Sequence, residues 1–318
     1  MTDRREFVAT ENNRLDRAVV SAMPELSRSQ VRRFIEEGLV EVAGTVATRP
    51  AHSVRVGTAI AVVEPVVPDL DWQSHDVPLD VLFEDEETLV LNKPAGIIVH
   101  PTPGSNDVTL INAVRSRYPE VRDIDDTGRG GIVHRLDRDT TGVIAVARSQ
   151  AAQFALKEQW KQRETLKHYS AIVVGYVDPS EGMIETQIGP EPHDPRRQAV
   201  VEQGRTARTE FHVLEQFGEE AALVDVRIYT GRTHQIRVHM AAIGNPVLGD
   251  WLYGKPSDLI VRQALHARLL GFSLPSSGAW REFEAPLPLD FQAVLDILRL
   301  RHSTESTTTL QAEESDDD

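Results

Sequence analysis

The 318-residue chain contains no cysteine. Without thiols it cannot form disulfides, use a thiolate nucleophile, or hold zinc or an iron–sulfur cluster through cysteine. It also has no apolar stretch long enough to cross a bilayer, and residues 1–6 are not followed by the apolar region of a secretory signal. We therefore expect a cytoplasmic protein without a membrane partner, whose covalent chemistry uses a nucleophile other than a thiolate.

Positive charge is also scarce, since 34 lysines and arginines stand against 49 aspartates and glutamates, a net charge of −15. This balance argues against a nucleic-acid binder, because affinity for phosphate comes largely from lysine and arginine. Binding depends on local charge, however. Acidic residues gather at 313–318, whereas arginines gather at 28–33, 129–138, 196–208 and 232–237. Basic surfaces on this acidic chain are therefore compatible with RNA binding.

Composition and periodicity divide the chain into five parts. Residues 1–12 are polar and are expected to be flexible, and residues 13–67 form a small module. Residues 68–80, rich in proline and acidic residues, are expected to be a linker. A larger domain follows at 81–303, and the acidic residues 304–318 are expected to form a disordered tail.

Apolar residues at helical spacing predict two helices in the small module, over 14–20 and 26–35. Ser27 is a good N-cap for the second helix, and Gln30 completes a capping-box pattern. Short strand patterns follow at 39–42, 45–47 and 58–63.

The larger domain mixes strand and helix patterns without strict alternation. Strands are predicted at 88–91, 142–147, 169–174, 209–214 and 223–227. Helices are predicted at 110–117, 151–163, 234–242 and 291–300. This hairpin-like order predicts an α+β fold with a mixed, largely antiparallel sheet.

A polar loop between two apolar segments carries the densest charge. From Arg135 to Asp139 it holds two carboxylates and two guanidinium groups, with Leu136 the only apolar member. In an extended loop, alternation would place Arg135, Asp137 and Asp139 on one side and turn Leu136 into the core. From the residues alone, a salt-bridged surface turn is the simpler interpretation, because runs of charge are usually solvated.

The same loop, HRLDRDTTG at 134–142, resembles the active-site signature of the RluA/RluD family of pseudouridine synthases. Further segments resemble family motifs in the same order, namely LNKPAG at 91–96, VHP at 99–101, KHYSA at 167–171, GRTHQIRVH at 231–239, PVLGD at 246–250 and LHA at 265–267. The likeness runs from about residue 81 to residue 300. It implies a pseudouridine synthase catalytic domain with a central cleft.

The resemblance implies roles for four residues. Asp137 is the implied catalytic carboxylate, and Arg237 is its implied partner through a charge-assisted hydrogen bond, bidentate if the geometry allows. That guanidinium would keep Asp137 ionised in a pocket where burial alone raises a carboxyl pKa. Tyr169 is the implied platform for the flipped base, with a hydroxyl that could help to remove the C5 proton. Arg135 would fill the vacated space or hold the RNA backbone.

Residues 13–67 resemble an S4 RNA-binding domain through RLD at 14–16, SRSQ at 27–30 and GLVEVAG at 38–44. Ala43 stands where such domains often carry asparagine before glycine, although the turn can still form. The likeness implies phosphate contacts from Arg28, Arg32 and Arg33, and Lys93 in the larger domain is a further candidate for RNA binding.

No cofactor or metal is expected. His234 and His239 are five residues apart, which does not match the spacing of a zinc-binding histidine pair. His100, His134 and His266 are expected to be hydrogen-bonded structural residues rather than general bases.

The predicted function is the isomerisation of specific uridines to pseudouridine in large-subunit (23S) ribosomal RNA, by a monomer. One alternative is an inert S4-type RNA-binding or ribosome-assembly factor, and another is a synthase for tRNA or other rRNA sites. A glycosidase would need a second carboxylate across the scissile bond, for which Asp139 is the only nearby candidate.

Overall fold

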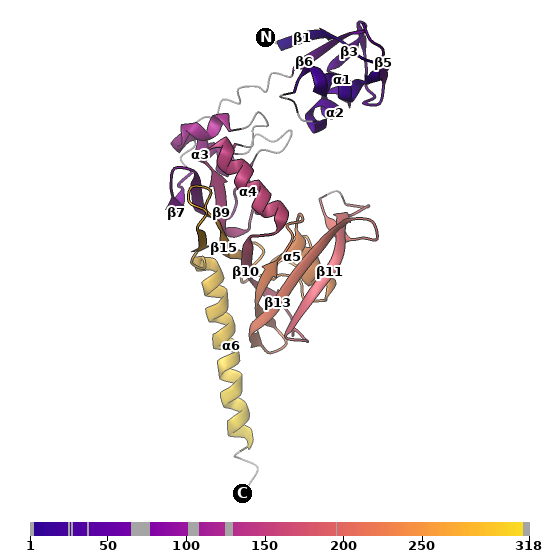
Figure 1. Cartoon of the computed structure of the whole chain (residues 1–318). Helices are drawn as coiled ribbons and strands as arrows, with labels where there is room; N and C mark the ends of the chain where they lie inside the picture. Colours follow the sequence, from indigo (N-terminus) through magenta and orange to yellow (C-terminus); the bar gives the residue numbers. More distant parts are fainter. Residues whose placement is uncertain are drawn as a thin grey trace. The chain divides into compact units, whose positions relative to one another are not determined.

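The computed structural model describes residues 3–24, 26, 28–36, 38–64, 77–100, 108–124, 130–194 and 196–313. The chain divides into two compact units, Met1–Gln73 and Ser74–Asp318 (Figure 1). Within these described ranges, no helix combines the length and the apolar character that a membrane span requires.

The small unit is a four-stranded sheet with two helices. Its strand order is β1-β6-β3-β4, with β1 at Asp3–Val8, β6 at Ala59–Glu64, β3 at Val40–Val42 and β4 at Thr45–Val46. Two short strands, β2 (Asn13–Arg14) and β5 (Ser53–Val54), pair separately, and the helices are α1 (Leu15–Ala22) and α2 (Arg28–Glu36). The apolar stripes of both helices form the core, among them Leu15, Val19, Val31, Phe34 and Ile35.

The turn between β3 and β4 forms despite the alanine at its first position. Ala43 has a φ of 49° and Gly44 a φ of 80°, the pair of positive values that a tight hairpin turn needs. The predicted capping box of α2 lies outside the described part of the chain, because Ser27 and the side chain of Gln30 are not among the described residues.

The expectation of a flexible segment at 1–12 needs correction. Residues Asp3–Val8 form β1, which pairs antiparallel with β6. Phe7 packs against the core of the small unit, and Ala9 is buried in it. The charged side chains that suggested flexibility include Arg4 and Glu6, which lie on the exposed side of this edge strand. Met1 and Thr2 lie outside the described residues.

The large unit is built on a ten-stranded sheet of order β12-β11-β13-β14-β10-β15-β9-β8-β7, with β16 paired to β15. The strands are β7 (Asp80–Glu84), β8 (Thr88–Lys93), β9 (Thr141–Ala147), β10 (Leu166–Val174), β11 (Glu181–Pro190), β12 (Gln198–Val200), β13 (Arg205–Phe217), β14 (Ala221–Ile228), β15 (Leu265–Ser273) and β16 (Trp280–Glu284). Its described strands pair antiparallel except β9 with β15, which are parallel. The predicted mixed, largely antiparallel sheet is confirmed.

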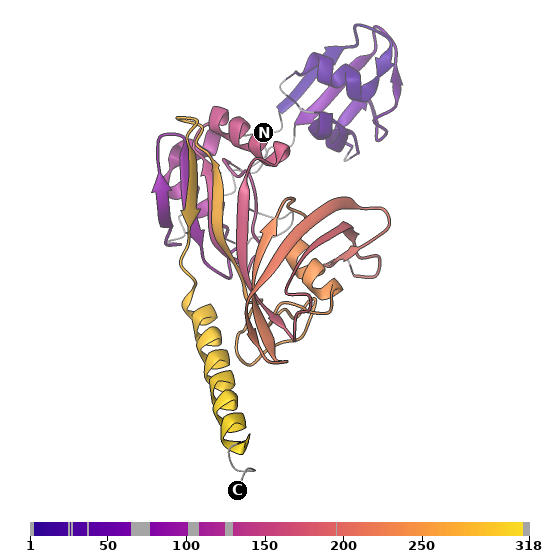
Figure 2. The same cartoon turned by 60° about the horizontal axis from the view of Figure 1, so that its bottom comes forward.

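Helices cover both faces of this sheet (Figure 2). Successive residues of β9 point to opposite faces. Ile144 shares a core with α3 (Leu110–Arg117). Val143 packs in a separate cluster with α4 (Gln150–Gln162). At the other half of the sheet, α5 (Gln235–Ala242) lies beside β12 and β13. A short 3-10 helix, η1 (Pro119–Asp123), follows α3.

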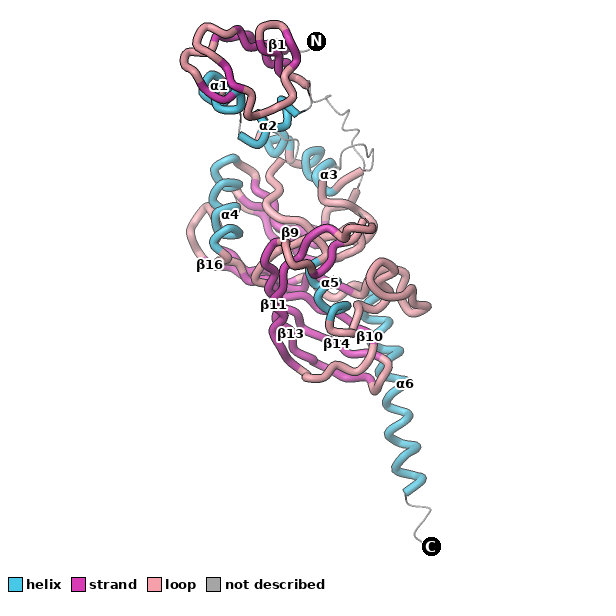
Figure 3. The backbone as a smooth tube through the Cα atoms, turned by 90° about the vertical axis from the view of Figure 1, so that its right-hand side faces the viewer, coloured by secondary structure: helices cyan, strands magenta, loops and turns pink. Residues whose placement is uncertain are grey.

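The last helix is longer than the sequence suggested. α6 spans Leu289–Glu313 (Figure 3). Phe291, Val294, Leu295 and Leu298 anchor its first turns in the core. We expected disorder from residue 304, but no glycine or proline between 289 and 313 ends the helix. Residues 314–318 lie outside the described part of the chain, as do residues 65–76 of the region around the expected linker.

Candidate active site

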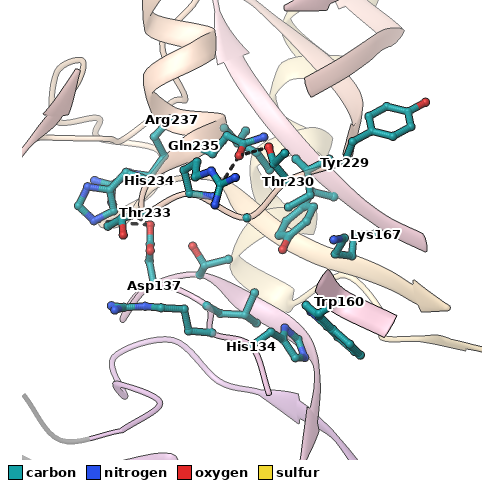
Figure 4. A pocket seen from close by; sticks show the side chains of 18 of the residues that line it. His134, Asp137, Trp160, Lys167, Tyr229, Thr230, Thr233, His234, Gln235 and Arg237 are labelled. Carbon is teal, nitrogen blue, oxygen red and sulfur yellow. Dashed lines mark hydrogen bonds and ion pairs between the residues drawn. The ribbon is translucent and has the colours of Figure 1, made fainter. Parts of the chain in front are cut away.

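A cavity of about 490 Å³ opens where the two halves of the large sheet meet several loops (Figure 4). Its walls come from the charged loop at 133–140, the end of α4, strand β10, the loop after β14 and the start of α5. The lining includes three of the predicted residues of the charged loop and strand β10, namely Arg135, Asp137 and Tyr169, together with Arg237 of α5.

The charged loop presents Asp137 to this cavity. Leu136 is buried in the core, as the alternation predicted. The N–H of Thr140 donates to the carbonyl of Asp137 at 3.2 Å and closes a turn around it. Arg237 donates from Nη1 to Oδ2 of Asp137 at 3.1 Å, and the two side chains are 6% and 18% exposed. The loop therefore places Asp137 in a largely buried ion pair at the cavity wall, and it is not a solvated surface turn.

The bidentate partner of Arg237 is Asp250, a residue for which we predicted no role. Arg237 donates from Nε and Nη2 to the two carboxylate oxygens of Asp250, at 2.6 and 2.8 Å. Asp250 is fully buried and also accepts the N–H groups of Leu252 and Tyr253. Burial lowers the pKa of Arg237, but the hydrogen bonds to Asp250 and the charge of Asp137 outweigh it and raise that pKa above its ordinary value. The motif at 246–250 was the available signal.

A histidine and a tyrosine complete this side of the cavity. His234 precedes α5 with a φ of 56°, a left-handed conformation that is uncommon outside glycine. Its Nε2 lies 3.9 Å from Oδ2 of Asp137, and its Nδ1 lies 2.8 Å from the hydroxyl of Tyr253. Burial lowers the pKa of His234 below its ordinary value, and the charge of Asp137 offsets only part of this effect. The Tyr253 ring lies 5.0 Å from the Arg237 guanidinium. Neither residue was predicted as part of the site.

Tyr169 and Arg135 lie at different depths of the cavity. Tyr169 is 8% exposed, and burial, with the charge of Asp137, raises the pKa of its hydroxyl. The phenol is therefore protonated at neutral pH, which suits a stacking platform better than a base for the C5 proton. Arg135 is exposed at the cavity wall.

Lys93 does not lie where a direct RNA contact would need it. It is completely buried, and its Nζ donates to the carbonyls of Pro94, Ile97 and Arg138 at 2.7 to 2.9 Å. Burial lowers the pKa of Lys93 to about 7. The expectation of RNA binding is corrected on this ground: Lys93 ties the 94–97 turn to the loop that carries Asp137.

The arginines of α2 belong to the small unit. Arg28 is exposed, and Arg32 is exposed with an ion pair to Glu36 at 2.8 Å. Such exposed pairs are worth little, so a phosphate can replace the carboxylate. The backbone of Arg33 lies in α2, but its side chain lies outside the described residues.

Two histidines are hydrogen-bonded as expected. His134 accepts the N–H of Ala145 at Nε2, and burial, with the charge of Lys167, lowers its pKa to about 3. His266 lies 2.8 Å from the hydroxyl of Thr141 and 3.2 Å from the carbonyl of Ala285.

The cavity has a single carboxylate among the described residues that line it, Asp137. Asp139 is not part of the lining, so the second carboxylate that a glycosidase needs is not supplied from this loop. The described residues also contain no group of three or more histidine, aspartate and glutamate side chains that could hold a metal ion.

Comparison with known proteins agrees with this geometry. Residues 87–242 match the family model described as RNA pseudouridylate synthase, and residues 13–60 match the S4 domain. The chain is 46% identical to an uncharacterized RNA pseudouridine synthase of Chloroflexus aurantiacus, with 91% of each chain covered. It is 41% identical to ribosomal large subunit pseudouridine synthase D of Nitrosomonas europaea, covering 92% of this chain and 87% of that one.

A solved structure shares the fold over about two thirds of the chain. Human RNA pseudouridylate synthase domain containing 4 superposes with a TM-score of 0.55 at 25% identity, covering 69% of this chain and 93% of that one. The likeness in sequence spans both units, through the matches at 13–60 and 87–242. The chain therefore belongs to the RNA pseudouridine synthases, as a member that carries an S4 domain before its catalytic domain.

Proposed function

We propose that this pseudouridine synthase modifies uridines of large-subunit ribosomal RNA, with Asp137 as the carboxylate that acts at the ribose. The observation that carries the role of Asp137 is its pairing with Arg237 at the wall of a cavity of about 490 Å³. The choice of RNA is supported by the relative from Nitrosomonas europaea, whose name specifies the ribosomal large subunit. The proposal includes a monomer that works in the cytoplasm.

The reaction breaks the N1–C1′ bond of uridine, turns the uracil, and forms a bond from C5 to C1′. C5 loses its proton and N1 regains one, so the product is an isomer of the substrate. A carboxylate beside the sugar can stabilise, attack or deprotonate the electron-poor intermediate state. Arg237 holds the orientation of Asp137 through a hydrogen bond of 3.1 Å from Nη1 to Oδ2.

The target base must leave its stack to reach Asp137, which costs a few kcal/mol. Stacking on the ring of Tyr169 recovers part of this cost. Arg135, exposed at the cavity wall, is placed to fill the vacated space or to hold the backbone. Arg28, Arg32 and Arg33 of the small unit would add phosphate contacts.

The test is a map of pseudouridines in total RNA from cells that lack the gene, complemented with the wild-type chain or with Asp137→Asn. We expect sites in large-subunit rRNA to be lost, and only the wild type to restore them. Loss of a general acid–base or nucleophilic carboxylate should slow modification by roughly 10²–10⁴-fold in vitro. Asp258→Asn, an exposed carboxylate outside the cavity, is the matched control and should restore the sites fully.

The map also separates the alternatives. Full restoration by Asp137→Asn would overturn the role of this carboxylate. Sites lost only in tRNA would overturn the choice of substrate. A growth or assembly defect without any lost site, rescued equally by both variants, would favour the inert RNA-binding factor.

A further inference from the structure

The cavity has a second wall that the chemistry at Asp137 does not use. Four cations line it: Arg163 at the end of α4, Lys167 in β10, Arg205 at the start of β13 and Arg232 in the loop after β14. We call these four residues the basic wall. Figure 4 shows Lys167 and Trp160 on one side of the cavity, and Asp137 and His234 on the other.

The carboxylates of the described residues do not neutralise the basic wall. Among the described residues, no ion pair involves Arg163, Arg205 or Arg232. Arg232 donates from Nε to the carbonyl of Thr206 at 3.0 Å, which fixes it over the start of β13. Burial lowers the pKa of Arg232, and the charges of Arg205 and Arg163 lower it further. Like charges held this close repel one another, and a bound anion would relieve that repulsion.

Lys167 is the clearest indication that the basic wall binds an anion. It is 7% exposed, and no described carboxylate or carbonyl forms an ion pair or hydrogen bond with its ammonium group. Buried lysines normally have such a partner, because burying an unpaired charge is costly. Lys167 and Tyr169 are two residues apart on β10, so they share the face that lines the cavity. The ammonium group therefore lies beside the proposed base platform.

We propose that the basic wall binds a backbone phosphate of the RNA strand next to the target uridine. This inference rests on the proposed function. Arginine forks match phosphate oxygens bidentately, and an ammonium group adds a compact charge. With the base on Tyr169 and the ribose at Asp137, the adjoining phosphodiester is the anion that enters the cavity along with the uridine. The wall thus recognises the backbone and not the base sequence.

The experiment measures steady-state kinetics on an RNA fragment that contains a uridine modified by the wild-type chain. Lys167→Met, Arg205→Gln and Arg232→Gln are compared with Arg299→Gln, which removes one positive charge on α6 outside the cavity. We expect each wall variant to raise KM about tenfold and to change kcat by less than about threefold. The slope of log affinity against log salt concentration should fall by the amount that corresponds to about one phosphate contact. The Arg299→Gln control should match the wild type.

A second arm removes the charge from the RNA. A methylphosphonate replaces the phosphate on the 5′ or the 3′ side of the target uridine in turn. We expect one of the two to weaken the wild type about as much as a wall variant, and to add little to the double variant Arg205→Gln with Arg232→Gln. This non-additivity is the sign that side chain and phosphate are partners.

The pH dependence gives a readout that a structural role would not produce. Burial, with the charge of Arg163, lowers the pKa of Lys167 to about 8. The ammonium charge is present below that pH and is lost as pH rises through it. KM of the wild type should therefore rise above about pH 8, whereas Lys167→Arg should keep a flat KM over the same range.

Two results would overturn the inference. One is a KM and salt dependence in all three wall variants equal to those of Arg299→Gln. The other is a full methylphosphonate penalty in the double variant, which would place the phosphate elsewhere. If Lys167→Met does not fold, the exposed Arg205 and half-buried Arg232 still decide the matter. A wild-type chain that modifies no uridine would instead reject the proposed function.

Discussion

At the scale of single residues, Arg237 holds two carboxylates in different ways. It makes two hydrogen bonds to Asp250 but only one to Asp137. The bidentate pair fixes the plane of the guanidinium group, so that Nη1 points at Asp137 without a further cost in side-chain entropy. Asp250 is thus a positioning residue for the proposed chemistry, although it does not line the cavity.

We therefore expect Asp250→Asn to weaken both stability and catalysis. The substitution leaves a buried guanidinium group with Asp137 as its remaining carboxylate partner. Breaking a buried pair in this way costs about 3–5 kcal/mol. We expect urea unfolding to show that loss, and single-turnover modification to slow by at least about tenfold because Arg237 loses its fixed orientation.

A matched control exists in the same unit. Asp290 also holds an arginine bidentately, Arg262, at 2.7 and 2.9 Å, but its side chain is 45% exposed. Solvent can compensate for the loss there, so Asp290→Asn should cost much less stability than Asp250→Asn. Equal unfolding free energies and equal modification rates for Asp250→Asn and wild type would show that Asp137 alone is enough to orient Arg237.

At the scale of elements, the site depends on the single parallel pairing among the described strands of the large sheet. β9 begins directly after the charged loop and meets β15 at Thr141 and Gly142. Gly142 has a φ of +114°, and a Cβ there would overlap the backbone carbonyl of Ala267. Only glycine allows the two strands to approach this closely, and the approach fixes where the loop leaves the sheet.

We therefore predict that Gly142→Ala is severely destabilising, by at least about 3 kcal/mol, or does not fold. Gly278→Ala is the matched control, because Gly278 also has a positive φ, +71°, but open space around it. Its cost should be only about 1–2 kcal/mol, the strain of the left-handed conformation. Thermal or urea unfolding of both variants checks the difference, and similar losses in the two would remove the argument from close strand approach.

Local patterns predicted many elements well because helices and short strands depend on nearby residues. The helix predicted at 110–117 matches α3. The helix predicted at 151–163 is displaced by one residue from α4, and the helix predicted at 234–242 differs from α5 only in beginning one residue early. Five strands of the large sheet were not predicted, namely β7, β11, β12, β15 and β16. β15 pairs with β9 and β10, which are distant in sequence, so no local partner marks it. β11 and β16 pair with neighbouring strands, but glycine, proline and charged residues interrupt their strand patterns.

The site residues also divide into those that local motifs indicate and those that depend on tertiary contacts. The sequence motifs indicated Asp137, Tyr169 and Arg237, which the fold brings to one cavity. His234 and Asp250 lie in motifs that the sequence analysis quoted, but no site role was predicted for them, because their roles depend on tertiary contacts with Tyr253 and Arg237. Lys93 seemed available to RNA because nothing in its neighbourhood in sequence shows that three carbonyl groups will enclose it.

At the scale of the whole molecule, each unit has its own core. The small unit closes on a cluster that includes Leu15, Val31 and Ile60. The large unit closes on two main clusters, on either side of β9. Because neither unit borrows core residues from the other, each is expected to fold by itself. Substrate selection and chemistry can therefore be separated by deletion.

Removal of residues 1–73 should leave a cooperative fold and the chemistry, while weakening selection of the natural RNA. We expect the large unit alone to modify a short RNA fragment at a rate within about threefold of the full chain, and to bind full-length rRNA at least about tenfold more weakly, since the phosphate contacts of the small unit are lost. Single-turnover kinetics on the fragment and filter binding of the full-length RNA give the two numbers.

The full chain with Arg28, Arg32 and Arg33 replaced by glutamine is the companion to this deletion. If these arginines contact phosphate, the triple variant should reproduce most of the loss in RNA affinity. The slope of its log affinity against log salt concentration should also fall by the amount that corresponds to up to about three phosphate contacts. Unchanged activity of the deletion on natural rRNA would end the role of the small unit in selection. If the deletion variant binds rRNA weakly while the triple variant binds it like the wild type, the charge of α2 is dispensable. The RNA contact would then lie on another face of the small unit.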